Sequence, residues 1–72
     1  MISIEDLKEL MNRQPFEPFT IVITSGETVD ITNPDNLAVG ESRLSYFVPK
    51  SDRWIMVRLN QIASIRSMNT AA

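Results

Sequence analysis

Two prolines three residues apart, Pro15 and Pro18, divide the chain into a short helical segment and a long β-rich segment. The residue before a proline is pushed out of the α-helical region, so a helix preceding Pro15 must end at or before Arg13. The same Pro-x-x-Pro spacing occurs in polyproline docking ligands, but those are exposed and flexible, whereas this segment joins two elements directly. We therefore interpret residues 15–18 as a hinge between a helix and a sheet.

The residues before this hinge predict one amphipathic helix over about residues 3–13. Ser3 is a favourable N-cap, and Asp6 stands three positions later, where a capping-box partner is expected. Leu7 and Leu10 fall on the same apolar stripe of the helix. A helix this short is marginal by itself in water, so we expect this stripe to pack against the rest of the chain.

The segment after the hinge, about residues 19–68, predicts five or six short strands. Apolar and polar residues alternate from Phe19 onward, and Gly26 lies in a Ser-Gly-Glu connection that is typical of a hairpin. Residues 33–36, Asn-Pro-Asp-Asn, form a dense turn signal. Short strands separated by turns at regular spacing are typical of a small barrel. The small-residue tail, 69–72, is predicted to be frayed.

The composition argues against catalysis. The chain has no cysteine and no histidine, which removes disulfides, thiolate metal sites, the usual zinc ligand and the commonest general base. Ser25, Ser42 and Ser51 fall in predicted turns, where hydroxyl groups commonly bond to the local backbone. No two carboxylates are spaced so that they must share an apolar site. We expect a protein that is not an enzyme and that uses no metal or cofactor.

The size and charge of the chain indicate how it is stabilised and what it binds. With 72 residues it is near the lower limit for a single domain, and oligomerisation is the remaining way to add stability. We expect one domain over residues 1–72 that forms a homo-oligomer. The net charge of −2 and pI of about 4.9 disfavour RNA as a partner but allow a local basic patch. No signal peptide or membrane-spanning helix is predicted, so we expect a cytoplasmic protein.

Two predicted strands, within residues 43–50 and 53–59, carry apolar residues on both faces. A strand with one solvated face would instead alternate with polar residues. Aromatic residues and Met are enriched at subunit interfaces. Either the N-terminal helix or another subunit covers the second face, and we favour another subunit or a protein partner. The predicted interface residues are Tyr46, Phe47, Trp54 and Met56.

Basic residues close to these aromatic side chains provide an alternative. RNA-binding surfaces combine stacking aromatic residues with Arg and Lys. The predicted nucleic-acid contacts are Arg43, Lys50, Arg53 and Arg58. The other interpretation is that these cations are ordinary solvated or acid-paired residues, since the chain also has nine acidic residues.

The order of elements resembles the Sm-like (Lsm/Hfq-type) superfamily of small β-barrels. The likeness covers roughly residues 4–68 and is carried by TIVITSGETVDI, residues 20–31, and VRLNQIASI, residues 57–65. It implies a mainly β (α+β) fold, in which a short N-terminal α-helix precedes a five-stranded, strongly bent antiparallel barrel of SH3-like or Sm-like type. Sm-like proteins form rings by pairing edge strands between subunits, which the resemblance implies here as well.

The RNA-binding residues of that superfamily are not present in this sequence. The first Sm motif has a second glycine after the hairpin, where Asp30 or Ile31 stands here. The segment 58–61, Arg-Leu-Asn-Gln, lacks the aromatic residue and the histidine that bind RNA in Hfq. The likeness to short uncharacterised bacterial proteins that share RQPFEPFTI, residues 13–21, is closer and implies no activity. We expect a homo-oligomeric structural or protein-interaction module, with a degenerate Sm-like RNA-binding protein as the alternative.

Overall fold

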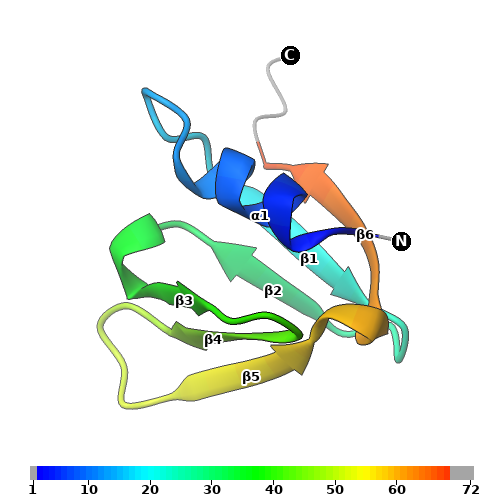
Figure 1. The fold of residues 1–72 in the computed structure, drawn as a ribbon. Helices are drawn as coiled ribbons and strands as arrows, with labels where there is room; N and C mark the ends of the chain where they lie inside the picture. The colour runs from blue at the N-terminus through cyan, green and yellow to red at the C-terminus, as the bar shows by residue number, and fades with distance from the viewer. Residues whose placement is uncertain (1, 69–72) are drawn as a thin grey trace.

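The computed structural model describes residues 2–68, which contain one α-helix followed by six β-strands (Figure 1). Two short 3₁₀ helices precede β3 and β6. The tail that was predicted to be frayed, residues 69–72, lies outside the described residues. In chain order the elements are α1 (Ile4–Met11), β1 (Phe19–Ile23), β2 (Thr28–Ile31), η1 (Pro34–Asn36), β3 (Leu37–Val39), β4 (Arg43–Phe47), β5 (Trp54–Arg58), η2 (Leu59–Gln61) and β6 (Ile62–Ser67).

The strands form two three-stranded antiparallel sheets. The first has the order β2-β1-β6 and the second β3-β4-β5, and η1 carries the chain from one to the other. Within residues 2–68 no strand pairing joins the two sheets, so they do not form a closed barrel. The mainly β, α+β class with an N-terminal helix is confirmed. The strand number is six rather than five because Pro34, which has no N–H for a ladder, begins η1 and divides β2 from β3.

Helix α1 begins at the predicted cap. The Ser3 hydroxyl accepts a hydrogen bond from the Asp6 N–H at 3.2 Å, and the Asp6 carboxylate accepts one from the Ser3 N–H at 3.1 Å. The bond from the Ser3 backbone, with a smaller contribution from its hydroxyl, holds the pKa of the Asp6 carboxyl below its ordinary value of 3.8. The helix ends at Met11, slightly earlier than predicted, and the Asn12 N–H closes it by bonding to the Lys8 carbonyl oxygen at 3.0 Å.

Residues 12–18 lead the chain from α1 into β1. Phe16 is half-buried and Phe19 is buried, and their rings meet edge to face with centroids 6.0 Å apart. The Pro18 carbonyl oxygen accepts a hydrogen bond from the Met68 N–H at 3.2 Å, beyond the end of β6. Phe16 and the Pro18 backbone thus hold the end of this segment against the sheet, as expected of a hinge, while residues 12–15 and Glu17 are exposed.

The β1–β2 hairpin closes at Gly26, as predicted. Gly26 has a φ of 97°, in the left-handed region that glycine adopts without steric cost. Its N–H donates to the Ile23 carbonyl oxygen at 2.8 Å. The hairpin register then places Phe19 opposite Ile31, so that both of these residues enter the core.

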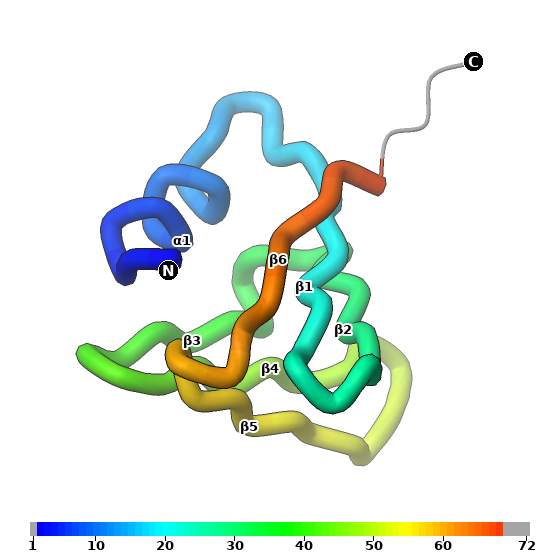
Figure 2. The backbone as a smooth tube through the Cα atoms, turned by 90° about the vertical axis from the view of Figure 1, so that its right-hand side faces the viewer, coloured from blue at the N-terminus to red at the C-terminus, as the bar shows by residue number. Residues whose placement is uncertain are grey.

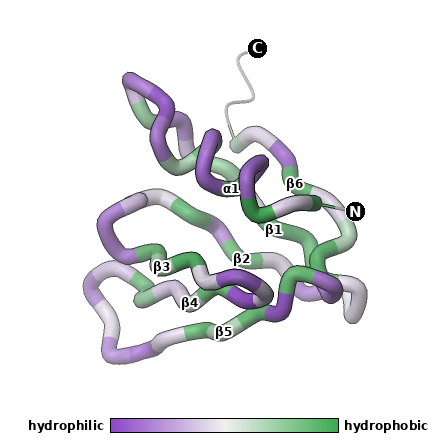
Figure 3. The backbone as a smooth tube through the Cα atoms, viewed as in Figure 1, coloured by the Kyte–Doolittle hydropathy of each residue, from purple (hydrophilic) through white to green (hydrophobic). Residues whose placement is uncertain are grey.

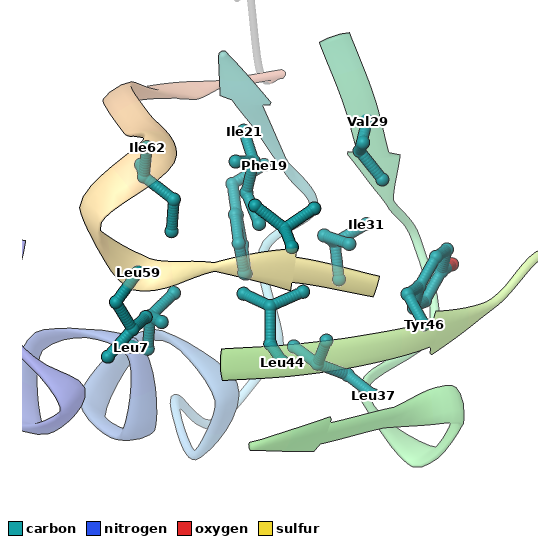
Figure 4. Packing of buried hydrophobic residues seen from close by; sticks show 11 residues of the cluster. Leu7, Phe19, Ile21, Val29, Ile31, Leu37, Leu44, Tyr46, Leu59 and Ile62 are labelled. Atoms are coloured by element: carbon teal, nitrogen blue, oxygen red, sulfur yellow. The ribbon is translucent and has the colours of Figure 1, made fainter. Parts of the chain in front are cut away.

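One layer of buried side chains lies between the two sheets (Figure 4). Leu7 enters it from α1, which lies across one open side between the sheets (Figures 1 and 2). Hydrophobic stretches of the chain coincide largely with the strands, and several connecting loops are hydrophilic (Figure 3). Every strand and η2 contribute to the layer, whose members are Leu7, Phe19, Ile21, Val29, Ile31, Leu37, Leu44, Tyr46, Val57, Leu59 and Ile62.

We predict that Leu7→Ala lowers the free energy of unfolding by about 3 kcal/mol, since truncating a fully buried Leu leaves a cavity. Leu7 is the one fully buried residue of α1. Lys8→Ala, at the exposed next position, is the matched control and should change the same quantity by less than about 0.5 kcal/mol. Urea unfolding measures both variants. Equal effects would contradict the docking of α1 through Leu7.

Candidate interaction surface

The outer face of the β3-β4-β5 sheet carries three large apolar side chains in contact with water. Phe47 of β4 is 58% exposed, and Trp54 and Met56 of β5 are 58% and 51% exposed. Side chains alternate along a strand, so the strand neighbours Tyr46, Ile55 and Val57 point toward the core instead. We call Phe47, Trp54 and Met56 the apolar patch.

Strand register brings the members of the apolar patch together. In the β4–β5 ladder Phe47 stands opposite Trp54, and Met56 stands opposite Ser45. Directly opposite residues of an antiparallel pair have side chains close enough to touch, and diagonal neighbours are within reach of aromatic rings. The patch is therefore one continuous apolar surface that spans two strands.

Tyr46, which was predicted for the same surface, lies in the core. It is 1% exposed, and its hydroxyl accepts a hydrogen bond from the Thr32 N–H at 3.1 Å. Adjacent residues of a strand point to opposite faces, so Tyr46 and Phe47 cannot belong to one surface. Helix α1 does not cover the patch, because Leu7 packs against the inner side of the sheets. The alternative in which the helix shields these side chains is thereby excluded.

The basic residues predicted to contact nucleic acid fall into two pairs on either side of the apolar patch. Arg43 stands opposite Arg58 at one end of the β4–β5 ladder. Lys50 and Arg53 lie at the other end, in or beside the connection between the two strands. All four are exposed, and the one ion pair found within residues 2–68 joins Arg13 to Glu17, away from this sheet. Two guanidinium groups thus face each other with no acidic partner, which is an unfavourable cross-strand pair.

A shallow groove of about 530 Å³ lies beside the two arginines. It is formed by the start of α1 and by the connections that precede β4 and follow β5. Arg43, Arg58, Ser42 and Asn60 give it hydrogen-bond donors, while Glu41 adds one carboxylate. These donors could bind an anionic group such as a phosphate, although the Glu41 carboxylate would repel it.

Strand β5 is an edge strand with unpaired backbone groups along one side. Its only partner within the described chain is β4. Val48 N–H donates to the Arg53 carbonyl oxygen at 3.0 Å, and Leu59 N–H donates to that of Ser42 at 2.9 Å. The N–H and C=O groups of successive residues point alternately to the two sides of a strand. Because Arg53 and Leu59 bond toward β4, the odd-numbered residues from 53 to 59 point these groups toward β4. The residues whose N–H and C=O groups point away from β4 are Trp54, Met56 and Arg58.

Three further findings bear on function. Among residues 2–68 no three acidic side chains cluster so that they could hold a metal ion. No helix in this range is long and apolar enough to cross a membrane. Comparison with protein-family models, with characterised proteins and with solved structures gives no match. The apolar patch and the basic residues beside it are therefore the features that point to a function.

We predict that Arg43→Thr raises the free energy of unfolding by roughly 0.5 kcal/mol at low salt, because it removes the repulsion from Arg58 across the ladder. Salt screens exposed charges, so the gain should shrink as ionic strength rises. Arg66→Thr is the control, since Arg66 stands opposite the neutral Thr20. Urea unfolding at two salt concentrations tests both variants. A loss of stability in Arg43→Thr would show that Arg43 has a favourable partner.

Proposed function

We propose that this protein is a non-enzymatic, homo-oligomeric structural or protein-interaction module that uses the apolar patch as its contact surface. The observation that supports this function is the exposure of Phe47, Trp54 and Met56 together on one sheet face. Contiguous apolar patches on small soluble proteins commonly mark interaction sites. Aromatic residues and Met are also the residue types enriched at the centres of interfaces. A cytoplasmic location belongs to this proposal.

An Sm-like or SH3-like barrel is part of the same proposal. It is supported by the position of η1, since β2 and β3 would form one bent strand if Pro34 to Asn36 did not interrupt them. Counted in that way, residues 2–68 hold five strands. The pairing of β6 with β1 also supports it, because the last strand must return to the first for a barrel to form. In this proposal α1 covers an open side of the barrel.

Self-association has a physical reason in this chain. A domain of 72 residues buries a small core, and this one has no disulfide to add stability. Burying one large aromatic side chain against a second subunit stabilises the associated state by about 2 kcal/mol. Association through the apolar patch would therefore add substantially to the stability of each subunit.

We predict that Trp54→Ser weakens self-association at least tenfold, since aromatic residues at the centre of an interface commonly contribute about 2 kcal/mol or more. The core should stay intact because Trp54 is largely exposed. Thr28→Ser, at an exposed position of β2, is the matched control. Light scattering coupled to size exclusion over a concentration series measures the mass of each variant. A monomeric wild-type protein, or an unchanged mass for Trp54→Ser, would refute the proposed surface.

A second candidate, a degenerate Sm-like RNA-binding protein, is favoured by the pairing of Arg43 with Arg58 beside the groove. Charge is unevenly distributed along the chain: residues 37–58 carry four basic and two acidic side chains, and residues 1–36 carry seven acidic and two basic ones. The β3-β4-β5 sheet is thus locally positive in an acidic protein. Cations on both sides of the aromatic pair resemble surfaces that bind single strands by stacking.

For this candidate we predict that the protein binds single-stranded RNA and that the association constant K falls steeply with salt. A plot of log K against log salt concentration should have a slope of about −0.7 for each phosphate contacted. The double variant Arg43→Gln and Arg58→Gln should lower both affinity and this slope. Lys8→Gln, on α1 and away from the sheet face, is the control. Fluorescence of the single Trp54 reports binding. No binding at low salt, together with a protein-like ratio of absorbance at 260 and 280 nm, would exclude RNA.

A further inference from the structure

We propose that two copies of this chain pair their β5 strands antiparallel about a two-fold axis at Met56. The two β3-β4-β5 sheets then become one continuous sheet across the dimer. This inference rests on the proposed homo-oligomeric function and names its partner as a second copy. Its basis is that the β5 edge complements itself in backbone direction and in side-chain chemistry.

The backbone of β5 permits this register. The unpaired N–H and C=O groups belong to Trp54, Met56 and Arg58, which are spaced two apart and centred on Met56. With Met56 opposite Met56 of the second copy, Trp54 stands opposite Arg58 of that copy. All of these pairs are then of the type that exchanges two hydrogen bonds, so each free donor on the edge has a free acceptor opposite.

The side chains match in the same register. On the outer face the Arg58 guanidinium lies beside the Trp54 ring of the second copy, a pairing favoured by cation–π attraction. The two Met56 side chains meet at the axis. On the inner face Ile55 stands beside Val57, and both are apolar. No like charges become opposite each other across the axis, whereas within one chain Arg58 faces Arg43.

The other sheet edges are less suited to this pairing. Charged side chains and short length protect a strand edge from association. Exposed Asp30 stands on β2 and exposed Arg66 on β6, and β3 has three residues. β5 has five residues, and its outward apolar side chains, Trp54 and Met56, belong to the apolar patch. β6 is one residue longer and β5 itself carries exposed Arg58, but β5 has the longest uninterrupted apolar run of the sheet edges within residues 2–68, Trp54 to Val57.

Cysteine cross-linking tests the axis, because the chain has no cysteine of its own. In the proposed register the two copies of position 56 have Cα atoms about 5.5 Å apart, within disulfide range. Met56→Cys should therefore form covalent dimers on mild oxidation or with a short bis-maleimide. Ala38→Cys is the matched control. It is exposed on β3, in register with Ser45, and its two copies would be roughly 24 Å apart across the dimer, from strand spacings of about 4.8 Å.

An exchange of residues tests the pairing of Trp54 with Arg58. Trp54→Arg places an arginine opposite Arg58 of the second copy and should weaken the dimer at least tenfold. Adding Arg58→Trp restores an arginine opposite a tryptophan and should return the dissociation constant to within about threefold of the wild-type value. A general effect of lost apolar surface would not be reversed in this way. Sedimentation at several concentrations gives both constants.

The outcomes separate this inference from the proposed function. A dimer with at least tenfold more cross-linking in Met56→Cys than in Ala38→Cys, and with rescue by the exchange, supports the two-fold pairing. An oligomer that lacks either result, such as a ring in which β5 contacts a different strand, overturns the pairing and leaves the homo-oligomeric function standing. A monomer at every concentration overturns both.

Discussion

The structure depends on one layer of apolar side chains that two small sheets share. A three-stranded sheet needs an apolar face covered by another layer, and here each sheet covers the other. Tyr46 can take part because the Thr32 N–H satisfies its hydroxyl. Since the inner faces are used in this layer and α1 adds Leu7 from the side, residues 2–68 hold no further element that could cover the outer face of the β3-β4-β5 sheet. The exposure of the apolar patch therefore follows from how the core is built.

Features that depend on a few neighbouring residues could be predicted from the sequence. The capping box of Ser3 and Asp6, the end of the helix before Pro15 and the hairpin at Gly26 all belong to this kind. The division of the strands into two sheets could not be predicted in this way. The pairing of β1 with β6 joins segments about forty residues apart, and no local pattern encodes such a pairing. The sequence predicted a turn at Pro34, but it did not predict that this turn would divide one strand into two.

The candidate surface likewise has features that the local sequence predicts and features that depend on strand pairing. Alternation was sufficient to place Trp54 and Met56 on one face of β5 and to separate Phe47 from Tyr46 on β4. The ladder register then places Phe47 on the same face as Trp54. The meeting of Arg43 with Arg58 depends on ladder register, because these residues are fifteen positions apart in the sequence. The sequence places the four basic residues near the aromatic ones, and only the ladder register divides them into two pairs.

The charge of this surface determines which kind of partner it fits. If an anion such as RNA binds between Arg43 and Arg58, it relieves their repulsion, and its affinity must fall steeply with salt. If a second copy pairs through β5, Arg58 gains an aromatic neighbour, and burial of apolar side chains supplies most of the attraction. Such burial is not weakened by moderate salt, and screening of the remaining repulsion between arginines would slightly favour it. The two modes also compete, since both use Arg58 and the outer face of β5. An oligomer that strengthens with salt would therefore assign this surface to the protein itself.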